Sequence, residues 1–537
     1  MPMRARGRLG PSVRSALSSG VAPALLAGAA GAATATALMA VVHTFAPHVP
    51  FPPLTIAQAI VRAAPGGFAT FFIDHLGHWA LRVAVAGTAV AFLASGAVLG
   101  LAIRPLRARL PWWASGSVAF APLWLGSVLL DQSRPGSVGR WPFALASLPV
   151  MAAGGAVAGR VAARLQVQRR AAMERDASGA DAPVDPSRRY LLRTLYVGTL
   201  GVVLGVADLG RLLYRRPDPG RLLLSQPVSP PPTPPPGPGD AGFASIAGLT
   251  PQITPLASFY VVDEEIIDPD IDPSAWRLAV AGRVGTPLHL TIRDLEALPL
   301  VERYQTLECI SNPIGGNLMS TALWTGVPLA EILTRATPAP ESAEVVFTCA
   351  GGYTESLPFA IAMDPTTLVV IGMDGHVLPR AHGYPARILS VGTYGMKNPK
   401  WLERIDLVAR PYEGYWEQRG WSKLASVQTF SRIDTPLQGE VVTGPVQVAG
   451  VAFAGARGIS RVEVSADAGS TWSAADLRTP LSPYTWVQWR STVPAGRGRT
   501  VLVVRATDGD GRLQARSVRP EHPSGATGYH AISIERR

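Results

Sequence analysis

The chain has 537 residues, enough for three or four domains at about 150 residues each, and its two cysteines exclude a disulfide-bonded framework. Its net charge of +11 is unevenly distributed, because residues 1–224 carry 23 Arg, no Lys and 8 acidic residues, whereas residues 225–537 carry 26 basic and 30 acidic residues. The basic excess lies beside hydrophobic segments, so it indicates orientation in a membrane, and we do not expect nucleic-acid binding.

Residues 1–224 are predicted to form an all-α membrane region. Five apolar stretches are long enough, or nearly so, to cross a bilayer, and their many Gly and Ala residues suit close helix packing in lipid. The N-terminal tail and the connections after the second and fourth stretches carry fifteen Arg in total. The connections after the first and third stretches carry four. This asymmetry predicts a cytoplasmic N-terminus and an extracytoplasmic C-terminal part. The stretches are Gly20–Val42, Val83–Ile103, Trp112–Leu130, Trp141–Gly159 and Thr194–Leu213.

The segment before the fifth stretch has two interpretations. Ser187–Arg193 resembles the twin-arginine export signal, with Leu191 in place of Phe and Arg193 in place of Lys. An ordinary cytoplasmic arginine cluster is the alternative. The position favours export, because that pathway carries folded, cofactor-loaded domains and a large polar region follows.

Four histidines lie near the outer ends of the first two stretches. They could ligate a haem that exchanges electrons with a soluble domain. Because no His pair lies in the middle of a stretch, interfacial or loop histidines are the favoured interpretation. The residues are His43, His48, His75 and His78.

A proline-rich linker is predicted for residues 225–240. Its composition is that of polyproline, with one valine as its only candidate core residue. At about 3.1 Å per residue it would be a semi-rigid spacer of a few nanometres.

Residues 241–423 are predicted to form an α+β domain with a mixed sheet, because short apolar runs alternate with turns and short helical segments. The expected strands are Trp276–Val280, Leu288–Thr291, Val345–Thr348, Thr367–Ile371 and Ala386–Val391, and the expected helices are Asp294–Leu298 and Pro328–Leu333.

Cys309 is the strongest single candidate for chemistry in this domain. It follows a strand-like run, Tyr304–Leu307, and precedes a turn rich in Pro and Gly at residues 312–316. A soft thiolate beside backbone that can approach a ligand closely suits a metal or cofactor. A buried structural thiol is the alternative for Cys309, and we interpret Cys349 as such a thiol.

Residues 251–412 resemble the molybdenum-cofactor domain of the sulfite oxidase family. The resemblance rests on sequence blocks that follow one another in the family's order. The blocks are Thr254–Tyr260, Trp276–Leu278, the Cys309 segment with Ser320–Gly326, Gly352–Pro358, Met373–Pro379, His382–Arg387, Tyr394–Leu402 and Gly414–Trp416.

The resemblance implies one Mo-molybdopterin per chain, with Cys309 as molybdenum ligand and catalytic residue beside two sulfurs of the pterin. It implies pterin contacts for the aromatic pair and contacts to phosphate and pterin for the polar residues. These cofactor-binding candidates are Phe259, Tyr260, His382, Arg387, Lys397, Asn398 and Lys400.

Three departures from the family bear on the substrate. The arginine that reads sulfite is replaced by Val262, and an acidic cofactor contact falls on Gly351. The family's active-site tyrosine falls on Glu413, and we take the nearby Tyr415 as the catalytic candidate. A pocket without its arginine should bind sulfite poorly.

Residues 424–537 are predicted to form an all-β immunoglobulin-like sandwich. Alternating strands are expected at Val446–Phe453, Ile459–Ser465, Thr485–Ser491 and Thr500–Thr507. The region resembles the dimerisation domain of the sulfite oxidase family, which implies a homodimer.

The sequence therefore predicts a multi-domain, multi-pass cell-membrane protein with an extracytoplasmic molybdenum oxidoreductase domain. We expect oxygen-atom transfer on a small, sulfur-containing substrate, with S-oxide reduction and sulfite oxidation as competing reactions. Because the sequence has no Cys-x-x-Cys-His motif, electrons should pass to or from a separate quinone or cytochrome, or through the membrane region. A non-catalytic, membrane-anchored binding or adhesion protein is the alternative class.

Overall fold

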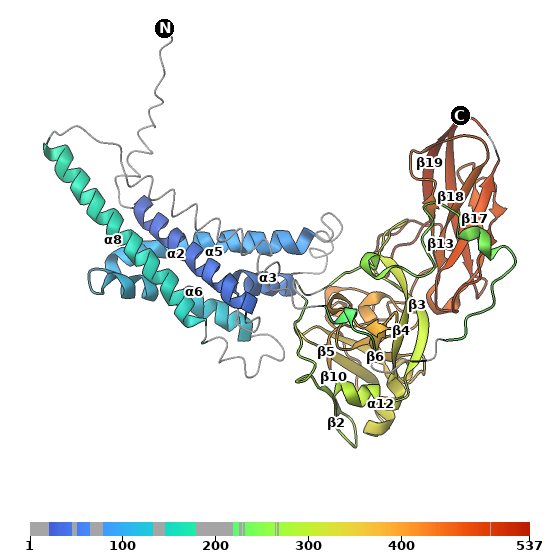
Figure 1. The fold of residues 1–537 in the computed structure, drawn as a ribbon, viewed down its shortest axis with the longest axis horizontal. Helices are drawn as coiled ribbons and strands as arrows, with labels where there is room; N and C mark the ends of the chain where they lie inside the picture. Colours follow the sequence, from blue (N-terminus) through green and yellow to red (C-terminus); the bar gives the residue numbers. More distant parts are fainter. Residues whose placement is uncertain are drawn as a thin grey trace, which may run out of the picture. The chain divides into compact units, whose positions relative to one another are not determined.

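The structure is a computed structural model, and it describes residues 21–45, 51–64, 79–132, 145, 147–178, 218–224, 228, 231–263, 265, 268–494 and 496–537. These residues divide into two compact units, one helical up to residue 178 and one mainly of strands from residue 218 onward (Figure 1). Each unit is considered by itself.

Small residues bring the helices of the first unit into close contact. A Cβ at Gly28 in α2 would collide with the backbone of Gly96 and Gly100 in α5, and one at Gly116 in α6 would collide with Gly155 in α8. This is the packing that helices use in lipid. The helices are α2 (Val21–Phe45), α3 (Pro52–Ala63), α5 (Trp79–Leu106), α6 (Trp112–Gln132) and α8 (Leu148–Ser178).

Two described helices are long and apolar enough to cross a membrane. They are α2, through Pro23–Ala40 with mean hydropathy 1.4, and α5, through Val83–Leu106 with mean hydropathy 2.0. The third and fourth predicted stretches form α6 and α8, which do not pass the same test. Five spans are therefore not established.

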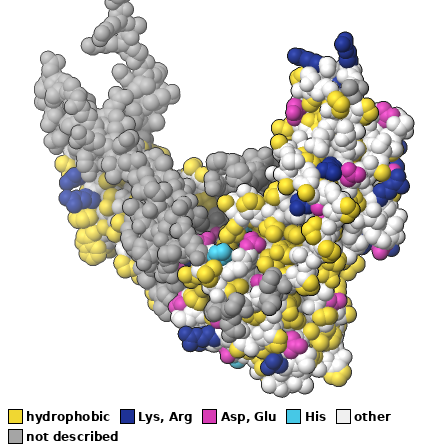
Figure 2. All heavy atoms as spheres, turned by 45° about the vertical axis from the view of Figure 1, so that its right-hand side comes forward, with side chains coloured by type: hydrophobic (Ala, Val, Ile, Leu, Met, Phe, Trp, Pro, Cys, Tyr) yellow, Lys and Arg dark blue, Asp and Glu magenta, His cyan; other side chains and the backbone are white. Residues whose placement is uncertain are grey.

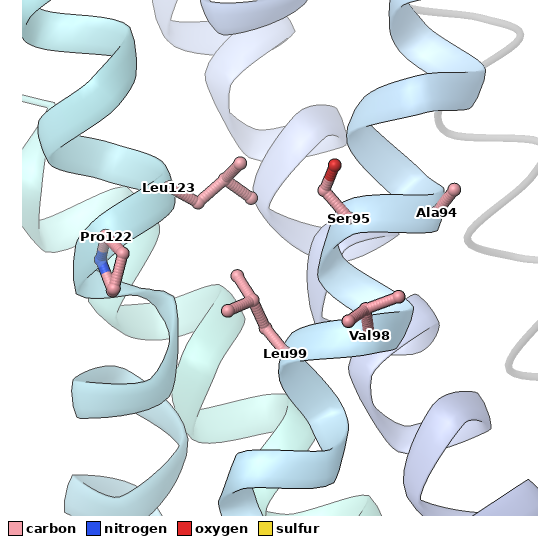
Figure 3. A pocket seen from close by; sticks show the side chains of 6 residues that line it. All are labelled: Ala94, Ser95, Val98, Leu99, Pro122 and Leu123. Carbon is pink, nitrogen blue, oxygen red and sulfur yellow. The ribbon is translucent and has the colours of Figure 1, made fainter.

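The surface of the helical unit is nevertheless apolar in the described part. Large apolar side chains such as Val90, Val98 and Leu129 are more than half exposed, and hydrophobic side chains cover much of the visible described face in Figure 2. An open apolar groove lies between α5 and α6 (Figure 3), lined by Ala94, Ser95, Val98, Leu99, Pro122 and Leu123.

The helical unit differs from the predicted pattern at α3 and α8. α3 occupies a predicted connection, and α8 continues to Ser178 through part of the Arg-rich segment that was expected to be a loop. That segment is rich in Ala, Arg and Gln, which favour helix. Thr194–Leu213, Ser187–Arg193, His48, His75 and His78 lie outside the described residues, as does the side chain of His43.

The second unit begins before the predicted end of the membrane region. The Val377 N–H donates to Leu222 O at 2.9 Å, and the Arg380 N–H donates to the Asp218 carboxylate at 3.2 Å. Residues 218–224 thus occupy backbone positions beside strand β8 (His376–Val377), whose edge would otherwise be unpaired. The second compact unit thus includes residues 218–224, the last seven residues of the predicted membrane region.

Two sheets build the domain at residues 241–423. The first has the order β2-β1-β10-β5-β6, with β1 and β10 parallel, and the second has the order β3-β4-β7-β8, with β9 paired to β7. The first contains β1 (Leu278–Gly282), β2 (Leu288–Leu290), β5 (Glu344–Cys349), β6 (Thr354–Pro358) and β10 (Leu402–Val408). The second contains β3 (Val301–Glu308), β4 (Met319–Pro328), β7 (Leu368–Met373), β8 and β9 (Arg387–Leu389).

One apolar core joins these sheets, with Val280 and Phe347 from the first packed with Ile371 from the second. α12 (Leu329–Ala336) covers it with Leu329, Ile332, Leu333 and Ala336, the spacing of one helix face. α11 (Ile292–Glu296) and α13 (Phe359–Ala362) complete the regular α elements. The predicted α+β domain with a mixed sheet is confirmed.

Residues 424–537 form the predicted sandwich. Its sheets have the orders β11-β13-β17-β16 and β12-β19-β18-β14-β15, and fully buried Trp489 packs between them with Val448 and Val504. The strands are β11 (Phe430–Thr435), β12 (Val441–Val442), β13 (Val446–Phe453), β14 (Ile459–Ser465), β15 (Ser473–Ala474), β16 (Asp476–Leu477), β17 (Val487–Val493), β18 (Gly498–Asp508) and β19 (His530–Arg536).

The end of the proline-rich linker is bound to the sandwich. The Asp240 carboxylate accepts the Gly237 N–H at 2.8 Å and the Thr479 N–H at 3.2 Å, and Arg490 stacks over Phe243. The last residues of the predicted spacer are therefore part of the folded second unit.

Candidate functional site

A pocket at the end of strand β3 brings together most of the predicted site residues. Its walls come from the segment before β1, the turn after β3 and the loops that flank β9. Seven of the predicted residues line it: Phe259, Tyr260, Cys309, His382, Arg387, Asn398 and Lys400.

Cys309 is held by a tight turn directly after β3. Its N–H donates to Leu318 O at 2.9 Å, and its carbonyl accepts the Asn312 N–H at 3.0 Å. The Asn312 side chain closes the turn by accepting the Leu318 N–H at 2.9 Å and donating to the Glu308 carboxylate at 2.9 Å. The Cys309 thiol is buried, which raises its pKa, so a bound cation would be needed to stabilise the thiolate.

An aromatic wall lies on one side of the pocket. Phe259 stacks on Tyr260 at 5.7 Å and meets Trp324 and His382 edge-on, at 5.6 and 5.0 Å between ring centroids. Burial and the nearby Arg387 charge lower the pKa of His382 to about 4. The imidazole is therefore neutral at pH 7 and can form hydrogen bonds without adding charge.

Arg387 is fixed by backbone acceptors. Its Nη1 donates to His382 O at 3.1 Å, its Nη2 donates to Asn398 O at 2.9 Å, and the guanidinium stands over the Trp324 ring. Asn398 itself accepts the Ser390 N–H at 2.6 Å. The loop and the guanidinium thus hold each other in place, with positive charge kept at the pocket wall.

Lys400 is paired with a carboxylate that sequence reasoning had not singled out. Its Nζ donates to Ala381 O at 3.1 Å and forms an ion pair with Asp263, which also lines the pocket. Burial lowers the pKa of Lys400 to about 7, and the Asp263 carboxylate opposes this effect by stabilising the ammonium. An anionic ligand would have to compete with Asp263 for this charge.

Two predicted residues do not line the pocket. Lys397 donates to the Glu355 carboxylate at 2.7 Å and also forms an ion pair with Glu417. Its charge is therefore balanced by carboxylates that lie outside the pocket. The Tyr415 ring lies 5.7 Å from the Tyr353 ring and beneath the Arg419 guanidinium. The sequence placed both near the site but could not show which way each side chain points.

Several pocket residues were missed as candidates. Met396, Tyr353, Trp416 and Ile310 lie within the sequence blocks that carry the family resemblance, which gave a signal for them. Trp421 lies outside these blocks. Val262, discussed for its lack of charge, also lines the pocket.

Gly351 has no side chain, but the carboxylate of another residue lies beside it. Gly351 has φ +91°, and a Cβ built there would collide with the Glu265 carboxylate. Glu265, which is buried, therefore places a carboxylate from another segment directly beside residue 351.

The sandwich supports the turn that carries Cys309. Arg432 in β11 donates to Gly316 O at 2.5 Å, to the Asp434 carboxylate at 2.6 Å and to Thr250 Oγ1 at 2.9 Å. The turn also packs tightly against β19 of the sandwich, since a Cβ at Gly315 would collide with the His530 ring.

The edge strand β3 is also joined to the sandwich. The Thr306 N–H donates to Tyr484 O at 3.0 Å, and the Trp486 N–H donates back to Thr306 Oγ1 at 2.9 Å. The sandwich therefore fixes both the strand and the turn that position the thiol.

Comparison with known proteins identifies both domains of the second unit. Residues 265–416 match the oxidoreductase molybdopterin binding domain, and residues 423–531 match the Mo-co oxidoreductase dimerisation domain. The chain is similar to mitochondrial sulfite oxidase of Homo sapiens, with 31% identity over 318 residues that cover 50% of this chain and 58% of that protein.

Two further similarities extend the comparison. NAD(P)H nitrate reductase of Hordeum vulgare is 29% identical over 334 residues, covering 50% of this chain and 37% of that protein. The crystal structure of the sulfane dehydrogenase SoxCD from Paracoccus pantotrophus has a TM-score of 0.48 and 22% identity, covering 53% of this chain and 82% of that one. The chain thus spans about half the length of its curated relatives.

The second unit therefore carries a molybdopterin-binding oxidoreductase domain followed by a Mo-co oxidoreductase dimerisation domain. These matches indicate an enzyme whose cofactor is Mo-molybdopterin, and they favour it over the non-catalytic binding or adhesion alternative. The donor set fits this cofactor, because it combines a soft thiol, an aromatic wall, a neutral imidazole and buried cationic groups.

The cross-domain contacts of Arg432 yield a stability prediction. Arg432→Ala leaves the buried Asp434 carboxylate without its guanidinium and frees the turn at Gly316, so we expect a loss of about 3 kcal/mol in the free energy of unfolding. Denaturant titration followed by tryptophan fluorescence measures this loss in the full chain.

Arg461→Ala is the matched control in the same domain. The Arg461 side chain is exposed, and its partner Glu463 keeps a second ion pair with Arg505, so the loss should be under about 1 kcal/mol. Equal effects of the two variants would contradict a role for Arg432 in joining the domains.

Proposed function

We propose that this molybdopterin enzyme is anchored in the cell membrane and transfers an oxygen atom to or from a small, sulfur-containing substrate outside the cytoplasm. The observation that carries the proposal is the position of Cys309 in one pocket with Arg387, His382 and Lys400. Bound there, Mo-molybdopterin supplies a metal that cycles between oxidation states during oxygen-atom transfer.

Each pocket residue has a role that its contacts support. Cys309 would bind molybdenum, Phe259 and Tyr260 would pack on the pterin, and the three polar residues Arg387, His382 and Lys400 would hold its phosphate and ring system. Asn398 would act through the backbone by keeping the loop around Arg387 closed. Lys397 and Tyr415 would act only indirectly, because they lie behind the pocket wall.

The substrate side of the pocket favours a neutral S-oxide. Val262, Ile310, Met396, Trp416 and Trp421 give it an apolar and aromatic lining, and the Lys400 charge is balanced by Asp263. A neutral sulfoxide loses little on entering such a surface, whereas a doubly charged anion requires charged partners. Sulfite oxidation is the second candidate, supported by the names of the curated relatives.

The electron partner and the assembly follow from the domains that the chain carries. Because the sequence has no Cys-x-x-Cys-His motif, we infer a separate quinone or cytochrome as electron donor or acceptor. The match of residues 423–531 to a dimerisation domain supports a homodimer.

Membrane anchorage is supported by two apolar helices, α2 and α5, and by the exposed apolar surface of the helical unit. The arginine asymmetry supports a cytoplasmic N-terminus, and Ser187–Arg193 supports export of the folded second unit. A haem on His43, His48, His75 or His78 remains the less favoured interpretation.

Cys309→Ser tests the metal ligand. The pterin would still hold the metal through its own sulfurs, so we expect the protein thiolate's contribution to the visible absorption to disappear and turnover to fall by at least about 100-fold. Absorption spectra, metal content and steady-state rates measure these changes.

Cys349→Ser serves as the control, because Cys349 is equally buried but does not line the pocket. A Cys309→Ser enzyme with the spectrum of the unmodified chain would refute ligation by Cys309.

Val262→Arg tests the substrate. An arginine at this pocket position should raise kcat/KM for sulfite by about tenfold and lower it for methionine sulfoxide, because it adds a charged partner for an anion to an apolar wall. Assays with a redox dye measure both reactions.

Val261→Arg is the adjacent control, since Val261 is exposed and does not line the pocket. Faster turnover of sulfite than of methionine sulfoxide by the unmodified chain would favour the sulfite oxidase candidate instead.

Export is tested by Arg188→Lys combined with Arg189→Lys, which keeps the positive charge but removes the guanidinium pair. If Ser187–Arg193 is a twin-arginine signal, the second unit should remain inside the cell and resist protease added outside. Arg169→Lys with Arg170→Lys, in the same Arg-rich segment, should leave cleavage unchanged. Equal cleavage of both double variants would contradict the signal.

A further inference from the structure

We propose that Glu355, Lys397 and Glu417 form a buried proton store that serves the pocket through Tyr353. The inference deepens the proposed oxygen-atom transfer and rests on it. Its three cluster residues do not line the pocket, and it gives Lys397 a role other than the cofactor contact that the family resemblance implies.

Three separate segments bring the cluster together. Glu355 lies in β6, Lys397 in the 3-10 turn Gly395–Lys397, and Glu417 in the 3-10 turn Glu417–Arg419. All three side chains are at most 2% exposed. The cluster is thus a buried site, and its outermost members, Glu355 and Glu417, are 62 positions apart in the chain.

The contacts within the cluster are direct. Lys397 Nζ donates to Glu355 Oε1 at 2.7 Å, to Glu417 and to Ser356 O at 3.2 Å. Glu355 Oε1 also accepts the Ser356 N–H at 2.7 Å, and Glu417 accepts the Gly414 N–H. One ammonium therefore serves two carboxylates.

This stoichiometry implies an extra proton. A structural ion pair needs one carboxylate for Lys397, and a second buried negative charge is costly unless it is neutralised. Burial raises the pKa of Glu355 to about 8, with Lys397 opposing the rise and Glu417 adding to it. Glu355 is therefore the group that holds the proton below about pH 8 and loses it above.

Tyr353 connects the cluster to the pocket. It lines the pocket beside Met396 and Trp416, and its hydroxyl lies 3.3 Å from Glu355 Oε2 and 2.9 Å from Met396 O. On its other side, the Tyr353 ring faces Tyr415, which carries Arg419 over its face. A single phenol therefore separates the proton store from the pocket.

Oxygen-atom transfer requires protons in either direction. Removing oxygen from an S-oxide breaks the S–O bond, consumes two protons and two electrons and releases water, with the electrons supplied by the quinol or reduced cytochrome inferred above. The reverse reaction takes oxygen from water and returns two protons and two electrons.

The other polar groups at the pocket are poor proton donors near neutral pH. Arg387 stays charged, and His382 is already neutral. Burial lowers the pKa of Lys400 to about 7, but its ammonium is stabilised by the ion pair with Asp263. Glu308 also has its pKa raised by burial to about 8, but it bonds Asn312 and does not line the pocket. The cluster behind Tyr353 is therefore the best-placed store among the described residues.

Glu355→Gln in the cofactor-loaded full chain tests the inference. With methionine sulfoxide at pH 7 we expect kcat to fall about 100-fold while KM changes less than about twofold, because proton delivery and not binding is removed. The unmodified chain should lose activity above about pH 8, and the variant should lack this limb of the pH profile.

Infrared difference spectra between pH 6 and 10 give a readout that does not depend on turnover. The unmodified chain and Glu463→Gln, a buried carboxyl of the sandwich paired with Arg505, should show a protonated carboxyl that titrates near pH 8. Glu355→Gln should lose the part of this component that Glu355 contributes, and the remainder should come from Glu308, whose pKa burial also raises to about 8.

Tyr353→Phe keeps the inference testable if Glu355→Gln does not fold. It should retain the infrared component but lose most of the rate, because the store remains and its connection is removed.

The outcomes separate the two proposals. An unmodified chain without turnover of methionine sulfoxide or sulfite refutes the proposed function. If the unmodified chain is active and Glu355→Gln has the same kcat and pH profile, the proton store alone is refuted. An infrared component near pH 8 that Glu355→Gln leaves undiminished refutes it as well.

Discussion

Burial of charge around one pocket is the constraint on which the second unit depends. Arg387, Lys397, Lys400, Glu355 and Glu417 are all less than 9% exposed, and each would be strongly destabilising without a partner. The fold meets this demand with backbone carbonyls for Arg387 and with carboxylates for the two lysines. The loops that carry these partners are therefore as necessary to the site as the pocket residues themselves.

The same constraint makes the sandwich part of the site. Arg432 reaches from β11 to the turn after Cys309, and Thr306 joins β3 to residues 484–486. The proposed role of Cys309 as a metal ligand calls for a rigid support. The two domains, although separate in sequence and matched to separate families, provide that support together.

Charge also distinguishes this pocket from one built for an anion. Val262 contributes no charge, and the Asp263 carboxylate balances the charge of Lys400. Behind Tyr353, the carboxyls of Glu355 and Glu417 offset the charge of Lys397, so this cluster adds no positive potential. Arg387 remains, and its guanidinium is held by the carbonyls of His382 and Asn398. The pairing of these charges supports the proposed chemistry, in which a neutral S-oxide binds in the pocket and Tyr353 connects the pocket to the proton store.

The sequence by itself determined the order of the domains, the mixed-sheet and sandwich folds, and seven of the pocket residues, because strand periodicity and ordered motif blocks are local in the chain. Only the tertiary structure decided that Lys397 turns away to Glu355 and Glu417, that Asp263 engages Lys400, and that residues 218–224 pair with β8. These are contacts between distant segments, and the direction of a side chain depends on partners that local sequence does not specify.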